Sequence, residues 1–119
     1  MTGEVENLVS RTKKFALRVI RLYSSLPKQT LAQVLGKQVL RSGTSVGANY
    51  REAFWARSSA EFVAKMGECV KELEETSYWF ELLLDTNLIT TERLHPLQDE
   101  CNQLLSIFVS IIKRKKRNS

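Results

Sequence analysis

The sequence predicts an all-α protein, an antiparallel up-down-up-down four-helix bundle that forms a single domain over residues 1–119. Apolar residues recur at spacings of three and four in four successive segments, which places them on one face of a helix in each. No segment alternates with a period of two, as a half-buried strand would. The segments are separated by short connections, and four amphipathic helices joined in this way pack as an up-down-up-down bundle.

The first two predicted helices cover about residues 4–26 and 28–57. The apolar stripe of the first consists of Val5, Leu8, Thr12, Phe15, Val19, Leu22 and Leu26. Pro27 ends this helix, and because proline is tolerated in a first turn, the second helix is expected to begin near Lys28. Its inward stripe consists of Leu31, Leu35, Val39, Ser42, Val46, Tyr50 and Ala53.

The third predicted helix covers about residues 58–86, and the fourth covers 91–114. Ser58 and Glu61 have the spacing of a capping box at the start of the third. The two stripes consist of Phe62, Met66, Cys69, Leu73, Thr76, Phe80 and Leu83, and of Leu94, Leu97, Cys101, Leu104, Phe108 and Ile111. Pro96 leaves two alternatives, because the fourth helix either begins later than Thr91 or has a kinked first turn.

Three glycines fall within the second predicted helix. Gly43 and Gly47 lack the G-x-x-x-x-G-K-[ST] pattern of a phosphate-binding loop, and the sequence has no G-x-G-x-x-G. On a helix, Gly36, Gly43 and Gly47 share one flank. Because each costs about 1 kcal/mol relative to alanine, the shared flank indicates a helix thinned for close approach of another helix. That helix could belong to the same chain or to another subunit.

The composition argues against several classes of protein. No apolar run reaches the roughly 18 to 20 residues of a membrane helix, and the N-terminal residues do not resemble a secretory signal, so we expect a soluble cytoplasmic protein without membrane contact. Cys69 and Cys101 fall on apolar stripes and are expected to be buried thiols. They offer no metal-ligand cluster with the single histidine, His95. No cofactor, metal or catalytic residue is predicted.

Charge is distributed unevenly along the chain. Residues 1–57 carry ten Lys or Arg and three acids, a net charge of +7, whereas residues 58–90 carry two lysines and seven acids, a net charge of −5. The predicted nucleic-acid-binding residues are Arg11, Lys14, Arg18 and Arg21 on the first helix and Lys113, Arg114, Lys115, Lys116 and Arg117 in a basic tail, residues 113–119. Repeated basic patches attract polyanions by releasing counterions.

The second and third predicted helices carry outer faces of opposite charge. The basic face consists of Lys37, Arg41, Arg51 and Trp55, and the acidic face consists of Glu61, Glu68, Glu72, Glu75 and Trp79. Because exposed large aromatic side chains often mark interfaces, we hypothesise that the basic face of one subunit meets the acidic face of its neighbour, together with Gly43 and Gly47. A contact between two different surfaces closes into a ring if the rotation permits.

The runs LRSGTSVGANYREA and EFVAKMGECVKELEETSYWFELL resemble a family of four-helix bundle proteins first noted as reading frames in intervening sequences of bacterial large-subunit ribosomal RNA. The resemblance covers about residues 5–115 and implies a ring-shaped homo-oligomer, with a pentamer suggested. More distantly, the chain is similar to accessory variability proteins of diversity-generating retroelements, which implies engagement of nucleic acid. The resemblance supplies no catalytic residues.

Sequence and resemblance together predict a non-catalytic, ring-forming bundle that binds RNA or DNA non-specifically through its basic surface. The alternative is an oligomeric scaffold or adaptor that recognises another protein, in which charge serves assembly alone.

Overall fold

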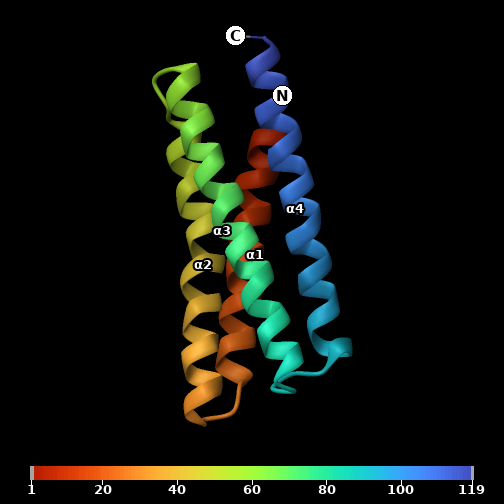
Figure 1. The fold of residues 1–119 in the computed structure, drawn as a ribbon. Coiled ribbons are helices and arrows are strands. Elements are labelled where there is room, and N and C mark those ends of the chain that lie inside the picture. The colour runs from red at the N-terminus through yellow and green to blue at the C-terminus, as the bar shows by residue number, and fades with distance from the viewer. Residues whose placement is uncertain (1, 119) are drawn as a thin grey trace.

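The computed structural model describes the backbone of residues 2–118 and the side chains of residues 8–118. It contains four helices, α1 (Thr2–Ser25), α2 (Thr30–Phe54), α3 (Ser59–Asp85) and α4 (Thr91–Arg117). They run alternately up and down in a bundle 48 Å long and 22 by 20 Å across (Figure 1). This confirms the predicted all-α bundle. Val5 of the predicted stripe lies outside the described side chains.

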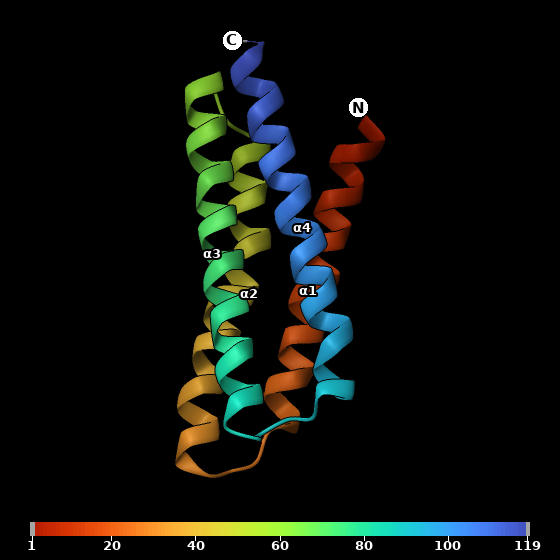
Figure 2. The same cartoon turned by 45° about the vertical axis from the view of Figure 1, so that its right-hand side comes forward.

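Each helix packs mainly against its neighbour in sequence. The α2–α3 interface is the most extensive, and α1–α2 and α3–α4 follow. The α1–α4 seam, which closes the bundle between the first and last helices, is the least extensive. Figure 2 shows α1 and α4 diverging toward the end where the C-terminus and the α2–α3 turn lie. The seam is therefore the most open side of the bundle.

The predicted stripes form the core with one exception. Phe15, Phe80 and Phe108 are fully buried at the centre, and the Phe108 ring stacks on Tyr50 at 5.6 Å. Leu31 was expected to face inward, but this prediction is wrong, since its side chain is 47% exposed. Ala32 occupies the buried position instead.

Side-chain caps mark where α3 and α4 begin. The Ser58 side chain accepts a hydrogen bond from the Glu61 backbone N–H at 3.1 Å, as the capping box predicts. The Glu61 carboxylate in turn accepts from the backbone N–H of Arg57, one residue before the expected partner. Thr90 caps α4 in the same way through Arg93. Because α4 therefore begins at Thr91, a later start is excluded, and Pro96 lies inside the helix.

The α3–α4 turn is a Schellman motif. Asn87 adopts a left-handed backbone conformation, with φ of 60°. The backbone N–H of Leu88 donates to the carbonyl of Leu83 at 3.0 Å, and that of Asn87 donates to Leu84 at 2.9 Å. Asparagine tolerates this conformation better than most residues. The turn places Ile89 in the core and sets the first turn of α4 beside the end of α1.

The glycine flank of α2 faces α1 of the same chain. A Cβ at Gly36 would lie 2.7 Å from Leu26 Cδ1, one at Gly43 would lie 2.8 Å from Val19 Cγ2, and one at Gly47 would lie 3.2 Å from Thr12 Oγ1. The prediction of a helix thinned for close approach is confirmed, and the approaching helix is intramolecular. Gly43 and Gly47, which the sequence placed at a subunit contact, are therefore covered within the chain.

Candidate nucleic-acid interface

The basic stripe of α1 divides into one paired residue and three unpaired ones. Arg11 forms a two-pronged ion pair with Glu100 of α4, at 2.7 and 2.8 Å, and also donates to Gln103 at 2.9 Å. The hydrogen bond from Glu100 raises the pKa of Arg11 against the opposing effect of burial. Arg11, predicted to bind nucleic acid, is therefore a bridge across the α1–α4 seam rather than an available cation.

Two of the remaining cations converge with an arginine of α4. Arg18 and Arg21 line a hollow of about 240 Å³ together with Arg93, and its floor is formed by Leu22, Ile89 and Leu97. Arg93 donates to the Ser25 hydroxyl at 2.8 Å, which holds its guanidinium near the end of α1. We call this set of three arginines the arginine hollow.

No carboxylate of the described side chains neutralises the arginine hollow. Arg18, Arg21 and Arg93 form no ion pair with any carboxylate of residues 8–118, and the same holds for Lys14 on the same stripe. Guanidinium groups match phosphate oxygens with paired hydrogen bonds, so a cluster of three suits a phosphate better than a single charge does.

Sequence reasoning missed Arg93, although one signal was present. A cation in the first turn of a helix opposes the helix dipole, which favours acidic residues at that place. Arg93 is the third residue of α4 and lies in that first turn. A charge placed against the dipole in this way suggests a role other than support of the helix.

The predicted basic tail is the last part of α4. The helix continues to Arg117, three residues beyond the predicted boundary, so the cations from Lys113 to Arg117 lie on ordered helix. The Lys115 Nζ atom lies 5.7 Å from the centre of the Phe62 ring of α3, a cation–π contact that fixes this end of α4 against the bundle. These cations lie at the opposite end of the molecule from the arginine hollow (Figure 1).

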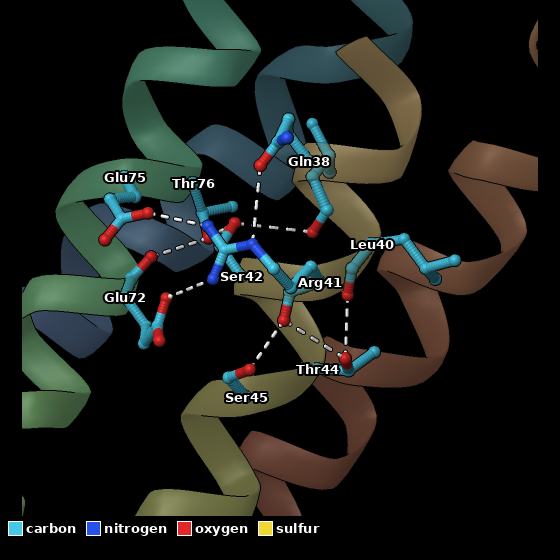
Figure 3. Close-up of polar contacts among 10 residues, drawn as sticks. Gln38, Leu40, Arg41, Ser42, Thr44, Ser45, Glu72, Glu75 and Thr76 are labelled. Atoms are coloured by element: carbon cyan, nitrogen blue, oxygen red, sulfur yellow. Dashed lines mark hydrogen bonds and ion pairs between the residues drawn. The ribbon is translucent and has the colours of Figure 1, made fainter. Parts of the chain in front are cut away.

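One basic residue and two acidic residues of the faces expected to join subunits meet within one chain. Figure 3 shows the Arg41 guanidinium between Glu72 and Glu75, at 3.2 and 2.6 Å. The hydrogen bond to Glu75 is the main cause of the raised pKa of Arg41. Lys65 of α3 pairs similarly with Glu52 of α2 at 2.6 Å. The attraction of these groups is satisfied by α2–α3 packing and requires no neighbouring subunit.

A buried polar contact lies beneath the Arg41 ion pairs. The Ser42 and Thr76 hydroxyls are 2.7 Å apart, and Thr76 donates to the Glu72 carbonyl at 2.7 Å (Figure 3). Both side chains are fully buried and satisfied, which is a packing role.

The two tryptophans differ in exposure. Trp79 is half-buried against the core, its ring meets Tyr78 edge-on, and its Nε1–H has no hydrogen-bond partner among residues 8–118. Trp55 is 77% exposed. The prediction of two outward tryptophans is therefore correct for Trp55 and wrong for Trp79. Lys37, Arg51, Glu61 and Glu68 are exposed, as expected for outer faces.

Groups suited to metal binding or nucleophilic chemistry are dispersed. No three His, Cys, Asp or Glu side chains of the described residues gather as metal ligands. Glu92 and His95 form one Glu-x-x-His pair, but both are exposed rather than directed into the core. Cys69 and Cys101 are buried free thiols whose Sγ atoms contact backbone carbonyls. Within the described helices there is no segment both long and apolar enough to cross a bilayer.

Fold and surface define the class of this protein as a compact all-α four-helix bundle with cationic clusters at both ends. Residues 6–110 match the family model of the 23S rRNA-intervening sequence protein, and the chain belongs to this family. It is also similar to a crystal structure from Bacteroides thetaiotaomicron, described as a protein of unknown function from the S23 ribosomal protein family. The two share 39% identity over 92% of this chain and 97% of that one, with a TM-score of 0.86. No curated protein matched the chain.

Proposed function

We propose that this chain is a cytoplasmic, non-catalytic, ring-forming bundle that binds nucleic acid non-specifically through the phosphate backbone. The observation that carries the proposal is the arginine hollow, which Arg18, Arg21 and Arg93 line together without an ion pair to any carboxylate of residues 8–118. Phosphate contacts from arginine fix a protein on nucleic acid without reading its sequence. A ring of identical subunits would present one arginine hollow on each subunit.

Charge reversal in the hollow is expected to weaken this binding selectively. The variant Arg18→Glu/Arg21→Glu/Arg93→Glu should bind labelled single-stranded RNA and duplex DNA at least about 10-fold more weakly in fluorescence anisotropy. The slope of log affinity against log salt should also flatten by about 0.7 to 0.9 for each phosphate that the variant no longer neutralises.

The matched control reverses three exposed lysines elsewhere, in the variant Lys28→Glu/Lys37→Glu/Lys71→Glu, and changes the net charge equally. It should retain most of the affinity and the wild-type salt slope. An equal loss of affinity in both variants would show that total charge alone governs binding. If the wild-type protein bound neither nucleic acid even at low salt, the proposed function would be overturned.

Exposed apolar side chains support the ring. Leu17 and Ile20 of α1 are each 41% exposed, and Leu31 and Val34 of α2 are 47% and 55% exposed. Apolar side chains on two different helices suit a contact between unlike surfaces, as a ring requires. The same side chains favour the alternative function, an oligomeric scaffold or adaptor that contacts another protein.

The variant Ile20→Lys/Val34→Lys is expected to reduce the light-scattering mass from that of a fixed oligomer to that of one chain, because it places charge in the proposed contact. Its circular dichroism should remain helical, since both side chains are exposed. Lys14→Ala, at an exposed position on the basic stripe of α1, serves as the control and should leave the mass unchanged. A wild-type protein that is monomeric at micromolar concentration would contradict the ring.

A further inference from the structure

The end of the bundle opposite the arginine hollow combines an exposed aromatic ring with cations. Trp55 caps the C-terminus of α2 and projects into solvent beside the α2–α3 turn. Its ring meets Phe54 edge-on, with centroids 5.1 Å apart. A hollow of about 550 Å³ at this place is lined by Arg51, Glu52, Trp55, Arg57, Glu61 and Lys65.

Each of the two carboxylates in this hollow already has a partner within the chain. Glu52 is paired with Lys65 at 2.6 Å, and Glu61 accepts the backbone N–H of Arg57 at 2.7 Å. The side chains of Arg51 and Arg57 form no ion pair with any described carboxylate. Arg51 on α2 and Arg57 in the turn thus line the same hollow as the exposed ring.

The end of α4 adds positive charge to the same region. Figures 1 and 2 both place the C-terminal end of α4 at the end of the bundle that carries the α2–α3 turn. The contact between Lys115 and the Phe62 ring holds α4 near the start of α3. The cations from Lys113 to Arg117 are exposed there.

We propose that this end of the bundle is a binding site for single-stranded nucleic acid, in which one base stacks on Trp55 and the adjoining phosphates contact Arg51 and Arg57. The inference rests on the proposed function and specifies its ligand. Proteins that hold single strands combine a cationic surface with aromatic rings on which bases stack. The bases of an intact duplex are stacked on one another and cannot reach an aromatic ring in this way.

The composition of the site favours a nucleic acid over a protein partner. Five of its six lining residues are charged and surround one aromatic ring. The centres of protein–protein interfaces are depleted in lysine and glutamate, three of which line this hollow, whereas an exposed ring in a hollow with two arginines suits a base between phosphates.

The chain has two tryptophans, so Trp79→Phe leaves Trp55 as the only indole fluorophore. Titration of this variant with a 20-nucleotide oligo(dT) or oligo(U) should quench more than half of its tryptophan emission. A 20-base-pair duplex and inorganic polyphosphate, which offer phosphates without accessible bases, should compete for the protein but quench little.

The affinity test uses Trp55→Leu. This variant should bind the single strands roughly 5- to 150-fold more weakly, the range found on removing one stacking aromatic residue, while its affinity for polyphosphate stays unchanged. Tyr78→Leu removes an aromatic side chain that is also exposed, at 53%, but lies elsewhere on α3, and should have no effect. Circular dichroism and light-scattering mass are measured on every variant.

Three results would overturn this inference, and they are distinguishable. Single-strand binding that neither quenches Trp55 nor weakens in Trp55→Leu would remove the stacking site and leave the proposed function intact. A changed mass in Trp55→Leu with unchanged single-strand affinity would assign Trp55 to a protein contact. The absence of binding to single strands, duplex and polyphosphate alike would overturn both proposals. Quenching by single strands without any binding of duplex or polyphosphate would support the stacking site and contradict backbone binding at the arginine hollow.

Discussion

Gly43→Ala is expected to lower the free energy of unfolding by up to about 2 kcal/mol. The added Cβ would lie 2.8 and 2.9 Å from the two γ-methyl groups of Val19 and 3.2 Å from its Cβ. Valine is restricted at χ1 in a helix and cannot rotate away, so α1 and α2 must separate. Overpacking of this kind costs about 1 to 3 kcal/mol, which outweighs the roughly 1 kcal/mol that alanine gains over glycine in a helix.

Gly67→Ala is the matched control, because it makes the same substitution inside α3, where a Cβ would meet nothing within 4 Å. It should raise the free energy of unfolding by up to about 1 kcal/mol through helix propensity. Urea unfolding followed by circular dichroism measures both variants. Adding Val19→Ala to Gly43→Ala should recover part of the stability, relative to the sum of the two single changes. A Gly43→Ala variant as stable as Gly67→Ala would disprove the close approach of the two helices.

The stability of the protein is expected to fall steeply above pH 9. Burial raises the pKa of both thiols, Cys69 and Cys101, to about 12. An exposed thiol in the unfolded chain ionises near a pKa of about 8.5. The unfolded state therefore releases protons that the folded state retains, so the stabilisation is complete below about pH 8.5 and is lost as the pH rises toward 12. Within this window, each thiol should lower the free energy of unfolding by about 1.4 kcal/mol per pH unit.

The control for this effect is the variant Cys69→Ala/Cys101→Ala. This variant should be less stable at neutral pH because the substitutions leave two small cavities. Between pH 9 and pH 10, however, its free energy of unfolding should fall by about 3 kcal/mol less than that of the wild-type protein, which is the loss expected from two thiols. The measured quantity is the free energy of unfolding in urea at intervals of half a pH unit. Parallel curves for the two proteins would show that other groups govern the alkaline loss of stability.

The helices and most of the core could be predicted because each depends on a repeat within one segment. Spacings of three and four identify the buried face of a helix, and this pattern does not depend on which other helix packs against that face. The prediction failed at the start of α2, where Leu31 and Ala32 both fit the spacing to Leu35. The structure buries Ala32 and exposes Leu31, a choice that the spacing within one segment does not determine.

The candidate site was less predictable because it depends on what one helix places opposite another. The partner of Arg11 is Glu100, 89 residues away in sequence, and Arg93 reaches Arg18 and Arg21 only after α4 folds back along α1. Periodicity indicates that a side chain leaves the core, but not whether a neighbouring helix covers or neutralises it. The same limit explains Trp79, whose outward position is half covered by the bundle.

The order in which the helices pack against one another has a consequence for folding kinetics. Apart from the sparse α1–α4 seam, the helix interfaces of the described residues join segments that follow one another in sequence. Such a chain has a low relative contact order, and helical proteins of this kind fold in microseconds to milliseconds. Each helical hairpin can form before a long loop must close. The first and last helices are separated by most of the chain, so bringing them together has the greatest cost in loop-closure entropy. Their interface is also the smallest, so it gives the least stabilisation from packing. Closure of this seam is therefore the step we expect to form last and to open first.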